Sequence, residues 1–171
     1  MNMSASPTRD EMRDDIADEV RRRLNEVSDS DIAEVDDAGK LASSMMALVP
    51  RATTFGELIG PVYSTKALSA MWGGMSRAGV SKRVSEGKLL ALKVERENLF
   101  PLFQFQGTEI REDVIALVRI LRPEADPFTI AQWLVAPLED CGGRSAIELL
   151  DAGDRASADK AAKKAARRWA M

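Results

Sequence analysis

The stretch 64–105 constrains the fold most, because its hydrophobic periodicity changes from helical to strand-like within one short segment. A first helix is expected over 65–72, and the pair Gly73-Gly74 ends it, since glycine readily adopts the left-handed conformation that closes helices. A second helix is expected over 77–86, with Ser76 as its N-cap. Two β-type runs follow around a polar turn, namely 88–94 and 99–105. This order predicts a helix-turn-helix followed by a β-hairpin wing.

The second of these helices has the composition of a DNA-recognition helix. Val80 and Val84 lie at i and i+4, so that edge is expected to pack inward while the polar side chains face outward. Lysine and arginine suit phosphates and guanine edges, and serine adds short hydrogen bonds. The stretch 64–88 has five basic residues and one acidic residue, although the whole chain has a net charge of −3. The predicted DNA-binding residues are Ser76, Arg77, Ser81, Lys82, Arg83 and Lys88.

Two features leave a second interpretation of this segment open. The pair Gly73-Gly74 departs from the usual spacing of a helix-turn-helix, so a looser turn is expected. Short matches to this motif are also frequent by chance. The alternative is therefore an ordinary packed motif whose positive charge is solvated.

The residue types that are scarce limit the possible chemistry. The chain of 171 residues has one cysteine, Cys141, and no histidine. A single cysteine excludes an internal disulfide framework and a zinc site built on cysteines. The absence of histidine removes the commonest general base, the commonest metal ligand and every Ser-His or Cys-His pair. We therefore expect a protein that is not an enzyme and that uses no metal or cofactor.

Bulk properties place the chain among globular proteins of one or two small domains. No apolar run approaches the ~18 residues of a membrane helix, and the polar N-terminus lacks the apolar core of a signal peptide. These features predict a cytoplasmic protein that does not interact with membranes.

Residues 1–50 are expected to form a helical region. A helix that starts at Ser6-Pro7-Thr8 has a narrow apolar stripe, and a second helical stripe runs from Ile32 to Leu48 and ends at Pro50. The first stripe consists of Met12, Ile16, Val20, Leu24 and Val27. It predicts a docking or dimerising helix, and packing on its own domain is the alternative. Because residues 1–40 hold twelve acidic and six basic residues, this region is not expected on DNA.

Beyond Gly107 the sequence is helical in pattern. Helices are expected over 109–121 and over 127–136, followed by a glycine-containing loop and a short helix that Ser145 caps. The last helix, 154–171, is rich in alanine, lysine and arginine. It has three interpretations: a solvated face, an additional DNA contact, or a segment that docks on a partner.

The predicted fold class is mainly α, a helical bundle with a helix-turn-helix and a small β-hairpin wing, followed by a small all-α domain. Three regions are predicted: a docking or dimerisation region over 1–50, a DNA-binding region over 51–106, and a helical domain over 107–171.

The later half of the chain resembles a known family. The series GKLLALK, FPLFQF, DPFTIAQWL, GGRSAIELL and AGD is similar to antitoxins of the Xre/MbcA/ParS family over roughly 55–154. The residues that match the family signature are Trp133, Leu134, Pro137, Leu138, Gly142, Gly143, Arg144, Leu149, Leu150, Gly153 and Asp154. The chain departs from the family at Ala146, where proline is usual, and at 138–140, where an asparagine is frequent.

The resemblance implies an antitoxin with two partners. Family members usually neutralise a toxin with a RES domain that degrades NAD, and they repress their own promoter as homodimers on double-stranded operator DNA. The net acidic segment 106–154 suits a basic nucleotide pocket on such a toxin. The implied toxin-binding residues are Pro137, Leu138, Gly142, Gly143, Arg144, Asp151, Gly153 and Asp154. The alternative function is a stand-alone winged-helix regulator or an excisionase-like DNA-binding protein.

Overall fold

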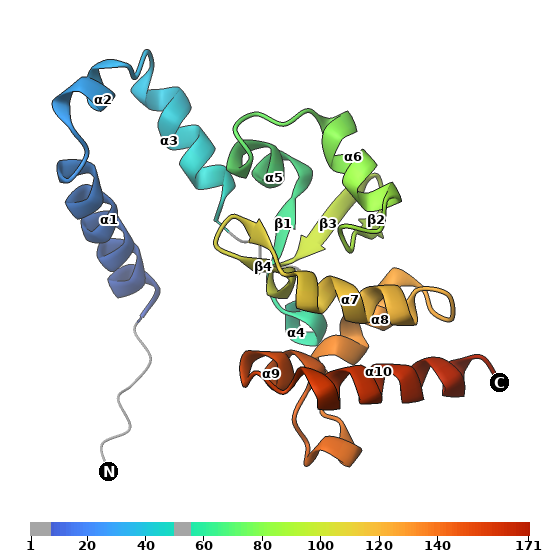
Figure 1. Ribbon diagram of the computed structural model, residues 1–171. Coiled ribbons are helices and arrows are strands. Elements are labelled where there is room, and N and C mark those ends of the chain that lie inside the picture. Colours follow the sequence, from blue (N-terminus) through green and yellow to red (C-terminus); the bar gives the residue numbers. More distant parts are fainter. Residues whose placement is uncertain (1–7, 50–55) are drawn as a thin grey trace, which may run out of the picture. The chain divides into compact units, whose positions relative to one another are not determined.

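The computed structural model describes residues 8–49 and 56–171, which are mainly helical with a small antiparallel sheet (Figure 1). This confirms the predicted fold class at that level. The chain divides into two compact units, Met1–Ala42 and Ser43–Met171, and each is described by itself. The predicted helix start at Ser6-Pro7 and the predicted stop at Pro50 lie outside the described residues.

The first unit consists of helices without a core. α1 (Arg9–Asn25) begins after Thr8, whose hydroxyl oxygen accepts the Glu11 amide hydrogen while the Glu11 carboxylate accepts the Thr8 amide hydrogen at 2.7 Å. This reciprocal pair is a capping box. Ser28 caps α2 (Asp29–Ala33), since its hydroxyl accepts the Asp31 amide hydrogen. None of the described side chains of α1 and α2 is buried, so these helices depend on local interactions for their stability.

α3 (Ala38–Ala47) corrects the prediction of one helical stripe from Ile32 to Leu48. The carboxylate of Asp37 accepts the amide hydrogens of Gly39 and Lys40 at 2.8 and 3.0 Å. An aspartate in this arrangement starts a new helix, because it satisfies amide groups that have no partner within the helix. The stripe is therefore split between α2 and α3.

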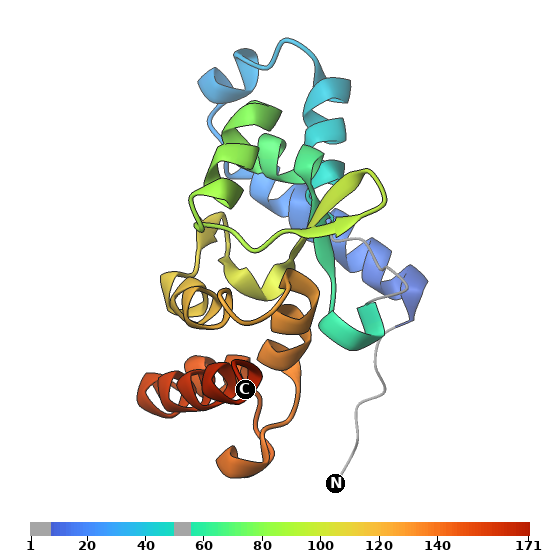
Figure 2. The same ribbon diagram turned by 90° about the vertical axis from the view of Figure 1, so that its right-hand side faces the viewer.

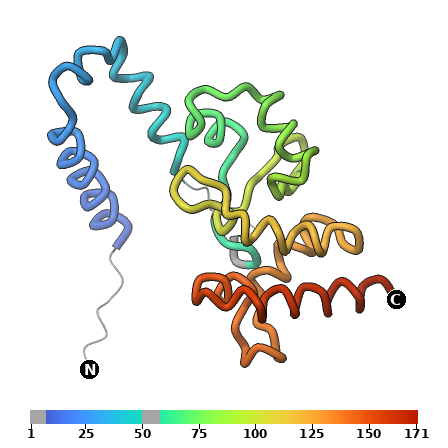
Figure 3. Tube along the Cα trace, viewed as in Figure 1, coloured from blue at the N-terminus to red at the C-terminus, as the bar shows by residue number. Residues whose placement is uncertain are grey.

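The middle of the chain forms a three-stranded sheet beside two helices. α4 (Gly56–Ile59) leads into β1 (Val62–Ser64), α5 (Thr65–Met71) and α6 (Arg77–Ser85), and the chain returns through β2 (Leu92–Val94) and β3 (Glu97–Pro101). The Cα trace in Figure 3 follows this path. The sheet is antiparallel with the order β1-β3-β2, and Leu99 of β3 pairs with Ser64 on one side and Leu92 on the other.

The second predicted β-type run is interrupted. β3 ends at Pro101, and the 3₁₀ helix η1 (Leu102–Gln104) separates it from β4 (Phe105–Gln106), which pairs with β5 (Glu109–Ile110) in a second, two-stranded sheet. Gln104 causes this break, because it is fully buried and hydrogen-bonds to backbone groups instead of continuing the strand. Leu90 donates its amide hydrogen to Gln104 Oε1 at 2.8 Å, and Gln104 Nε2 donates to Leu90 O at 2.9 Å and to Pro101 O at 3.2 Å.

Two of the C-terminal helices begin where the sequence predicts, but the helix expected over 109–121 begins only at Glu112, because Glu109–Ile110 form β5. Asp126 caps α8 (Pro127–Val135) by accepting two amide hydrogens, and Ser145 and Glu148 form a capping box at α9 (Ala146–Asp151). The remaining elements are α7 (Glu112–Leu121), the 3₁₀ helix η2 (Glu139–Cys141) and α10 (Arg155–Trp169). α10 packs against α7 and α9, and Figure 2 shows it below α7.

One core joins the middle of the chain to its C-terminal helices. Ile59, Val62 and Leu92 pack in the same cluster as Leu117 and Leu134. The sequence placed these residues in two regions divided at residue 106, whereas the structure packs them within one compact unit. A smaller cluster lies under α5 and α6 and consists of Leu68, Val80, Leu89, Phe100 and Phe105.

In the part of the chain that the structure describes, no helix is both long and apolar enough to cross a membrane.

Candidate nucleic-acid and partner interfaces

Two glycines shape the turn between α5 and α6. Gly73 and Gly74 have φ angles of +63° and +83°, a conformation that side chains with a Cβ rarely adopt. The Gly74 amide donates to Ser69 O at 2.8 Å, and the Ser69 hydroxyl donates to Met75 O at 2.6 Å. Ser69 thus fastens both ends of the turn, so the two-glycine connection is held by specific hydrogen bonds.

The buried edge of α6 fixes which of its side chains face solvent. Val80 is buried with Leu68 and Phe100, and Val84 is half-buried against the same cluster. Arg77, Ser81 and Lys82 remain exposed on the same helix. The predicted inward edge of the helix is confirmed.

A hollow of about 280 Å³ lies between α6, the start of α5 and the β2–β3 hairpin. Its cationic groups are Lys66, Arg77 and Arg96, and they form no ion pair with any residue in 8–49 or 56–171. The other lining residues are Ser64, Thr65, Ser81, Glu97 and Asn98. Three cations with hydroxyl and amide groups around one carboxylate favour an anionic ligand such as a phosphate.

Three predicted DNA-binding residues lie outside this hollow and have partners within the chain. The Ser76 hydroxyl caps α6 by accepting the Gly79 amide hydrogen at 3.1 Å. Lys82 and Lys88 lie 3.8 and 2.8 Å from the carboxylate of Glu86. The hydrogen bond from Lys88 is the main cause that lowers the pKa of Glu86. This carboxylate offsets part of the positive charge on that side of α6.

Arg83 corrects the expectation that it faces outward. It is half-buried, and its guanidinium carbon lies 4.8 Å from the centre of the Trp72 ring, within cation–π range. The Trp72 indole nitrogen donates to Thr108 O at 2.9 Å. Arg83 and Trp72 therefore connect α6 to α5 and to the turn between β4 and β5.

The sequence did not identify Lys66, Arg96 and Asn98 as site residues. Lys66 lies in the first turn of α5, Arg96 lies in the hairpin turn, and Asn98 lies in β3, where it pairs with Lys93. They meet Arg77 only because β1 pairs with β3, which brings the start of α5 to the hairpin. The only sequence signal was their charge and polarity within a segment of positive net charge.

The predicted toxin-binding residues form a loop and a helix start. Leu138 donates its amide hydrogen to Arg144 O at 3.1 Å and accepts from the Gly143 amide at 3.0 Å, so the loop is closed by backbone hydrogen bonds. Gly142 and Gly143 have φ angles of +68° and +80°. Pro137 and both glycines are exposed, whereas Leu138 is half-buried against the core.

Asp154 joins this loop to α10. Its carboxylate caps the helix by accepting the Ser157 amide hydrogen at 3.1 Å, and hydrogen bonds from Ser157 lower its pKa. Arg144 lies 3.9 Å from the same carboxylate. Gly153 precedes the cap with a φ angle of +77°. The structure therefore brings Arg144, Gly153 and Asp154 together on one surface.

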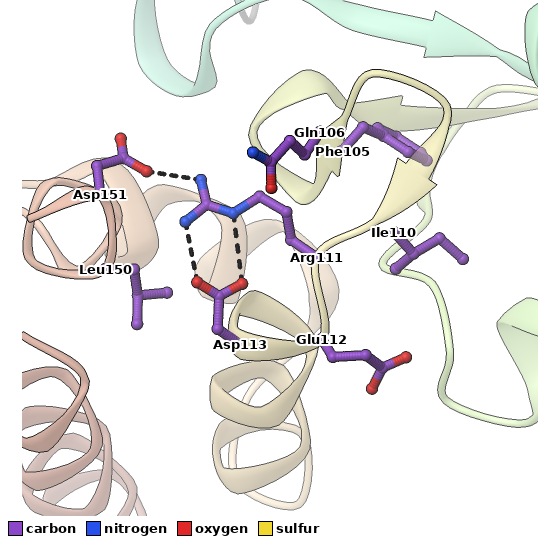
Figure 4. Close-up of a pocket in the computed structure, with 8 residues that line it drawn as sticks. All are labelled: Phe105, Gln106, Ile110, Arg111, Glu112, Asp113, Leu150 and Asp151. Atoms are coloured by element: carbon purple, nitrogen blue, oxygen red, sulfur yellow. Dashed lines mark hydrogen bonds and ion pairs between the residues drawn. The ribbon is translucent and has the colours of Figure 1, made fainter. Parts of the chain in front are cut away.

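Asp151, the remaining predicted residue, is paired within the chain (Figure 4). Arg111 donates to Asp151 Oδ1 at 2.7 Å and to Asp113 at 3.0 and 3.3 Å, on one wall of a hollow of about 560 Å³. The Arg111 side chain is only 15% exposed. Burial by itself would lower the pKa of Arg111, but the two carboxylates outweigh it and raise that pKa. The three charges connect the start of α7 to the end of α9.

Replacing Arg111 with glutamine is expected to lower the free energy of unfolding by about 2 kcal/mol, because the half-buried Asp113 loses its charged partner. Urea unfolding followed by circular dichroism measures the change. Arg119→Gln is the matched control, since Arg119 is half-exposed and lies 3.6 Å from Glu112. We expect it to change stability by less than about 0.5 kcal/mol. Equal effects of the two substitutions would contradict a structural role for the Arg111 cluster.

The same cluster predicts a loss of stability in acid. Burial alone would raise the pKa of Asp113, but hydrogen bonds from Arg111 and from the Val114 amide outweigh it and lower that pKa. The resulting stabilisation is present above the ordinary aspartate pKa of about 3.9 and is lost as pH falls through the lowered value. The midpoint of thermal unfolding should therefore be higher for the wild type than for Asp113→Asn at neutral pH, and this difference should disappear as pH falls below about 4. A constant difference between the two at all pH values would refute this origin.

Comparison of the chain with protein-family models, with characterised proteins and with solved structures finds no match. Within the described residues, no three side chains among aspartate, glutamate, cysteine and histidine lie close enough together to hold a metal ion.

Proposed function

We propose that the protein binds double-stranded DNA through the hollow between α6 and the β2–β3 hairpin. The observation that carries this proposal is the convergence there of Lys66, Arg77 and Arg96, none of which has an ion-pair partner in the described chain. Phosphate contacts supply much of the affinity of DNA-binding proteins, and they require such unpaired cations. Arg77 and Ser81 lie on the exposed side of α6, from which side chains can reach base edges.

In this proposal α5 and α6 act as a helix-turn-helix and the β2–β3 hairpin acts as its wing. α6 enters the major groove, while Arg96 at the hairpin turn contacts the phosphate backbone. Arg83 acts indirectly, since its contact with Trp72 orients α6. Ser76 likewise serves as a cap.

We further propose that the protein is an antitoxin whose C-terminal helices bind and neutralise a toxin. This part rests on the resemblance of 133–154 to the Xre/MbcA/ParS family, which implies a RES-type toxin that degrades NAD. The exposed loop from Pro137 to Arg144 supports it, because backbone hydrogen bonds hold its shape before any partner binds. DNA binding at the hollow then represses the operon that encodes both proteins.

The antitoxin proposal is tested by co-expression with each neighbouring gene product. A toxin should co-purify at fixed stoichiometry and lose its ability to inhibit growth in the complex. Gly142→Asp/Gly143→Asp should abolish co-purification but leave DNA binding intact, because both glycines are exposed and lie far along the chain from the hollow. If no neighbour binds while DNA binding persists, a stand-alone winged-helix regulator or an excisionase-like protein is the function that remains.

We also propose that α1 forms the homodimer by pairing antiparallel with α1 of a second copy. Met12, Ile16 and Leu24 are 44, 53 and 41% exposed on one stripe, and no described residue of the first unit covers them. Residues 9–19 contain six acidic and two basic residues, whereas residues 20–27 contain three arginines and one glutamate. Antiparallel pairing sets each acidic half against an arginine half, and parallel pairing sets like charges together.

Ile16→Glu is therefore expected to reduce the dimer fraction at least tenfold, because it places a charge in the centre of the stripe. Sedimentation velocity over a range of protein concentrations measures the change. Asn25→Glu adds the same charge to the same helix outside the stripe and should leave the association unchanged. A wild-type protein that stays monomeric at every concentration would rule out this dimer.

A further inference from the structure

α10 carries a row of cations that the proposed function does not use. Lys160, Lys163, Lys164 and Arg167 recur at i, i+3, i+4 and i+7, which places them on one face of the helix over about 10 Å. All four are exposed, and a shallow hollow of about 650 Å³ runs along them. We call these four residues the cationic stripe.

The opposite face of α10 is packed, so the orientation of the stripe is fixed. Ala158 and Ala162 are fully buried in the core, and Trp169 meets Trp133 edge-on with ring centres 6.4 Å apart. The contact between α10 and α7 is more extensive than the contact between α10 and α9. The stripe is therefore a fixed surface on the second unit, facing away from the core.

This arrangement of charge destabilises the helix that bears it. Neighbouring cations at i, i+3 and i, i+4 repel one another. Only Lys164 has a carboxylate partner, Asp140, while Lys160, Lys163 and Arg167 form no ion pair within the described residues. The helix dipole favours cations only in the last turn, so it does not compensate for Lys160 or Lys163. An anionic ligand would relieve this repulsion.

The chemistry of the stripe distinguishes between two classes of partner. The centre of a protein interface is apolar, whereas the hollow along the stripe offers one apolar residue, Ala156, and one carboxylate, Asp159, besides its four cations. Interfaces with nucleic acids are strongly positive and need no apolar centre. Residues 43–171 also have a net charge of +3, although the whole chain has a net charge of −3.

We propose that the cationic stripe binds the phosphate backbone of nucleic acid, as a second site separate from the hollow at α6. Figures 1 and 2 both place α7 between α6 and α10, so the two sites lie in different parts of the same unit. A duplex held at the hollow leaves the stripe free for a second stretch of nucleic acid. The protein would then bridge two segments without any requirement for sequence at the second one.

The experiment measures binding of a short mixed-sequence duplex, as DNA and as RNA, to the full chain over a range of salt concentrations. The hollow is first disabled by replacing its three cations in Lys66→Gln/Arg77→Gln/Arg96→Gln, so that the remaining affinity reports the stripe. Adding Lys163→Gln/Arg167→Gln should then weaken binding at least tenfold. It should also reduce the slope of log K against log salt by about 1.8, since each lost phosphate contact contributes about 0.9. The control is Arg9→Gln/Arg119→Gln, which removes the same charge at two exposed positions on other helices and should leave the slope unchanged.

A second measurement tests the repulsion without nucleic acid. Lys163→Gln/Arg167→Gln should raise the midpoint of thermal unfolding at low salt, and this rise should disappear at high salt, where the repulsion is screened. The proposal is overturned if the stripe and control variants bind the duplex with equal slopes. It is also overturned if the stripe variant loses binding only to poly-glutamate, because the partner would then be an acidic protein. Operator binding by the chain with an intact hollow, measured in parallel, reports separately on the proposed function.

Discussion

Gln104→Leu is expected to lower the free energy of unfolding by about 3 kcal/mol, although leucine fits a buried position. The Gln104 amide satisfies the amide and carbonyl groups of Leu90 and the carbonyl of Pro101, all inside the protein. Leucine leaves these three backbone groups without partners, and each buried unsatisfied group costs about 1 kcal/mol or more. The hydrogen bonds of Gln104 also position η1 between the two sheets, so losing them should destabilise both sheets.

Urea unfolding at neutral pH measures this effect. Gln106→Leu is the matched control. Gln106 is a glutamine two residues later in the chain, and it is exposed on β4. That substitution should change stability by less than about 0.5 kcal/mol. Equal stability of Gln104→Leu and Gln106→Leu would show that the buried Gln104 amide does not stabilise the segment between β3 and β4.

Arg77→Gln/Arg96→Gln is expected to weaken operator binding by about 100-fold, with each arginine contributing about tenfold. Both side chains line the hollow, and neither has an internal ion pair within 8–49 or 56–171 that would hold it away from a ligand. The same pair of substitutions should reduce the salt dependence of operator binding, because phosphate contacts are lost. The probe is the DNA upstream of the chain's own reading frame, titrated by fluorescence anisotropy.

Arg9→Gln/Arg119→Gln serves as the control for this experiment. It makes the same change in net charge at two exposed positions outside the hollow. The control should bind the operator within about twofold of wild type. Equal losses in the two variants would show that net charge, and not the hollow, drives binding. Thermal unfolding of both variants should match that of the wild type, which separates binding from folding.

Sequence patterns identified the elements that are stabilised within a few residues. Ser76 and Ser145 cap helices where expected, because a cap needs only an oxygen beside the free amides of the first turn. The buried edge of α6 followed from the spacing of its valines. The break at Asp37 does not show in the apolar stripe, because the stripe continues across the aspartate that caps α3.

The contacts that build the candidate site were not predictable in this way. Arg83 met the criteria for an outward-facing residue and instead packs on Trp72. Asp151 was predicted as a partner-binding residue, and it bonds to Arg111, forty positions earlier in the chain. In both cases the partner lies on another element, and no spacing within one helix reveals it.

By itself, the sequence determined most of the helices, several of their caps, the charge of each region and the exclusion of histidine chemistry. Only the tertiary structure decided which cations meet at the hollow, because Lys66, Arg77 and Arg96 come from three elements that the pairing of β1 with β3 brings together. It likewise decided the fully buried position of Gln104. The physical reason is range: a cap or an apolar stripe is stabilised by neighbours within one or two turns, whereas a site built from distant segments depends on how the whole core packs.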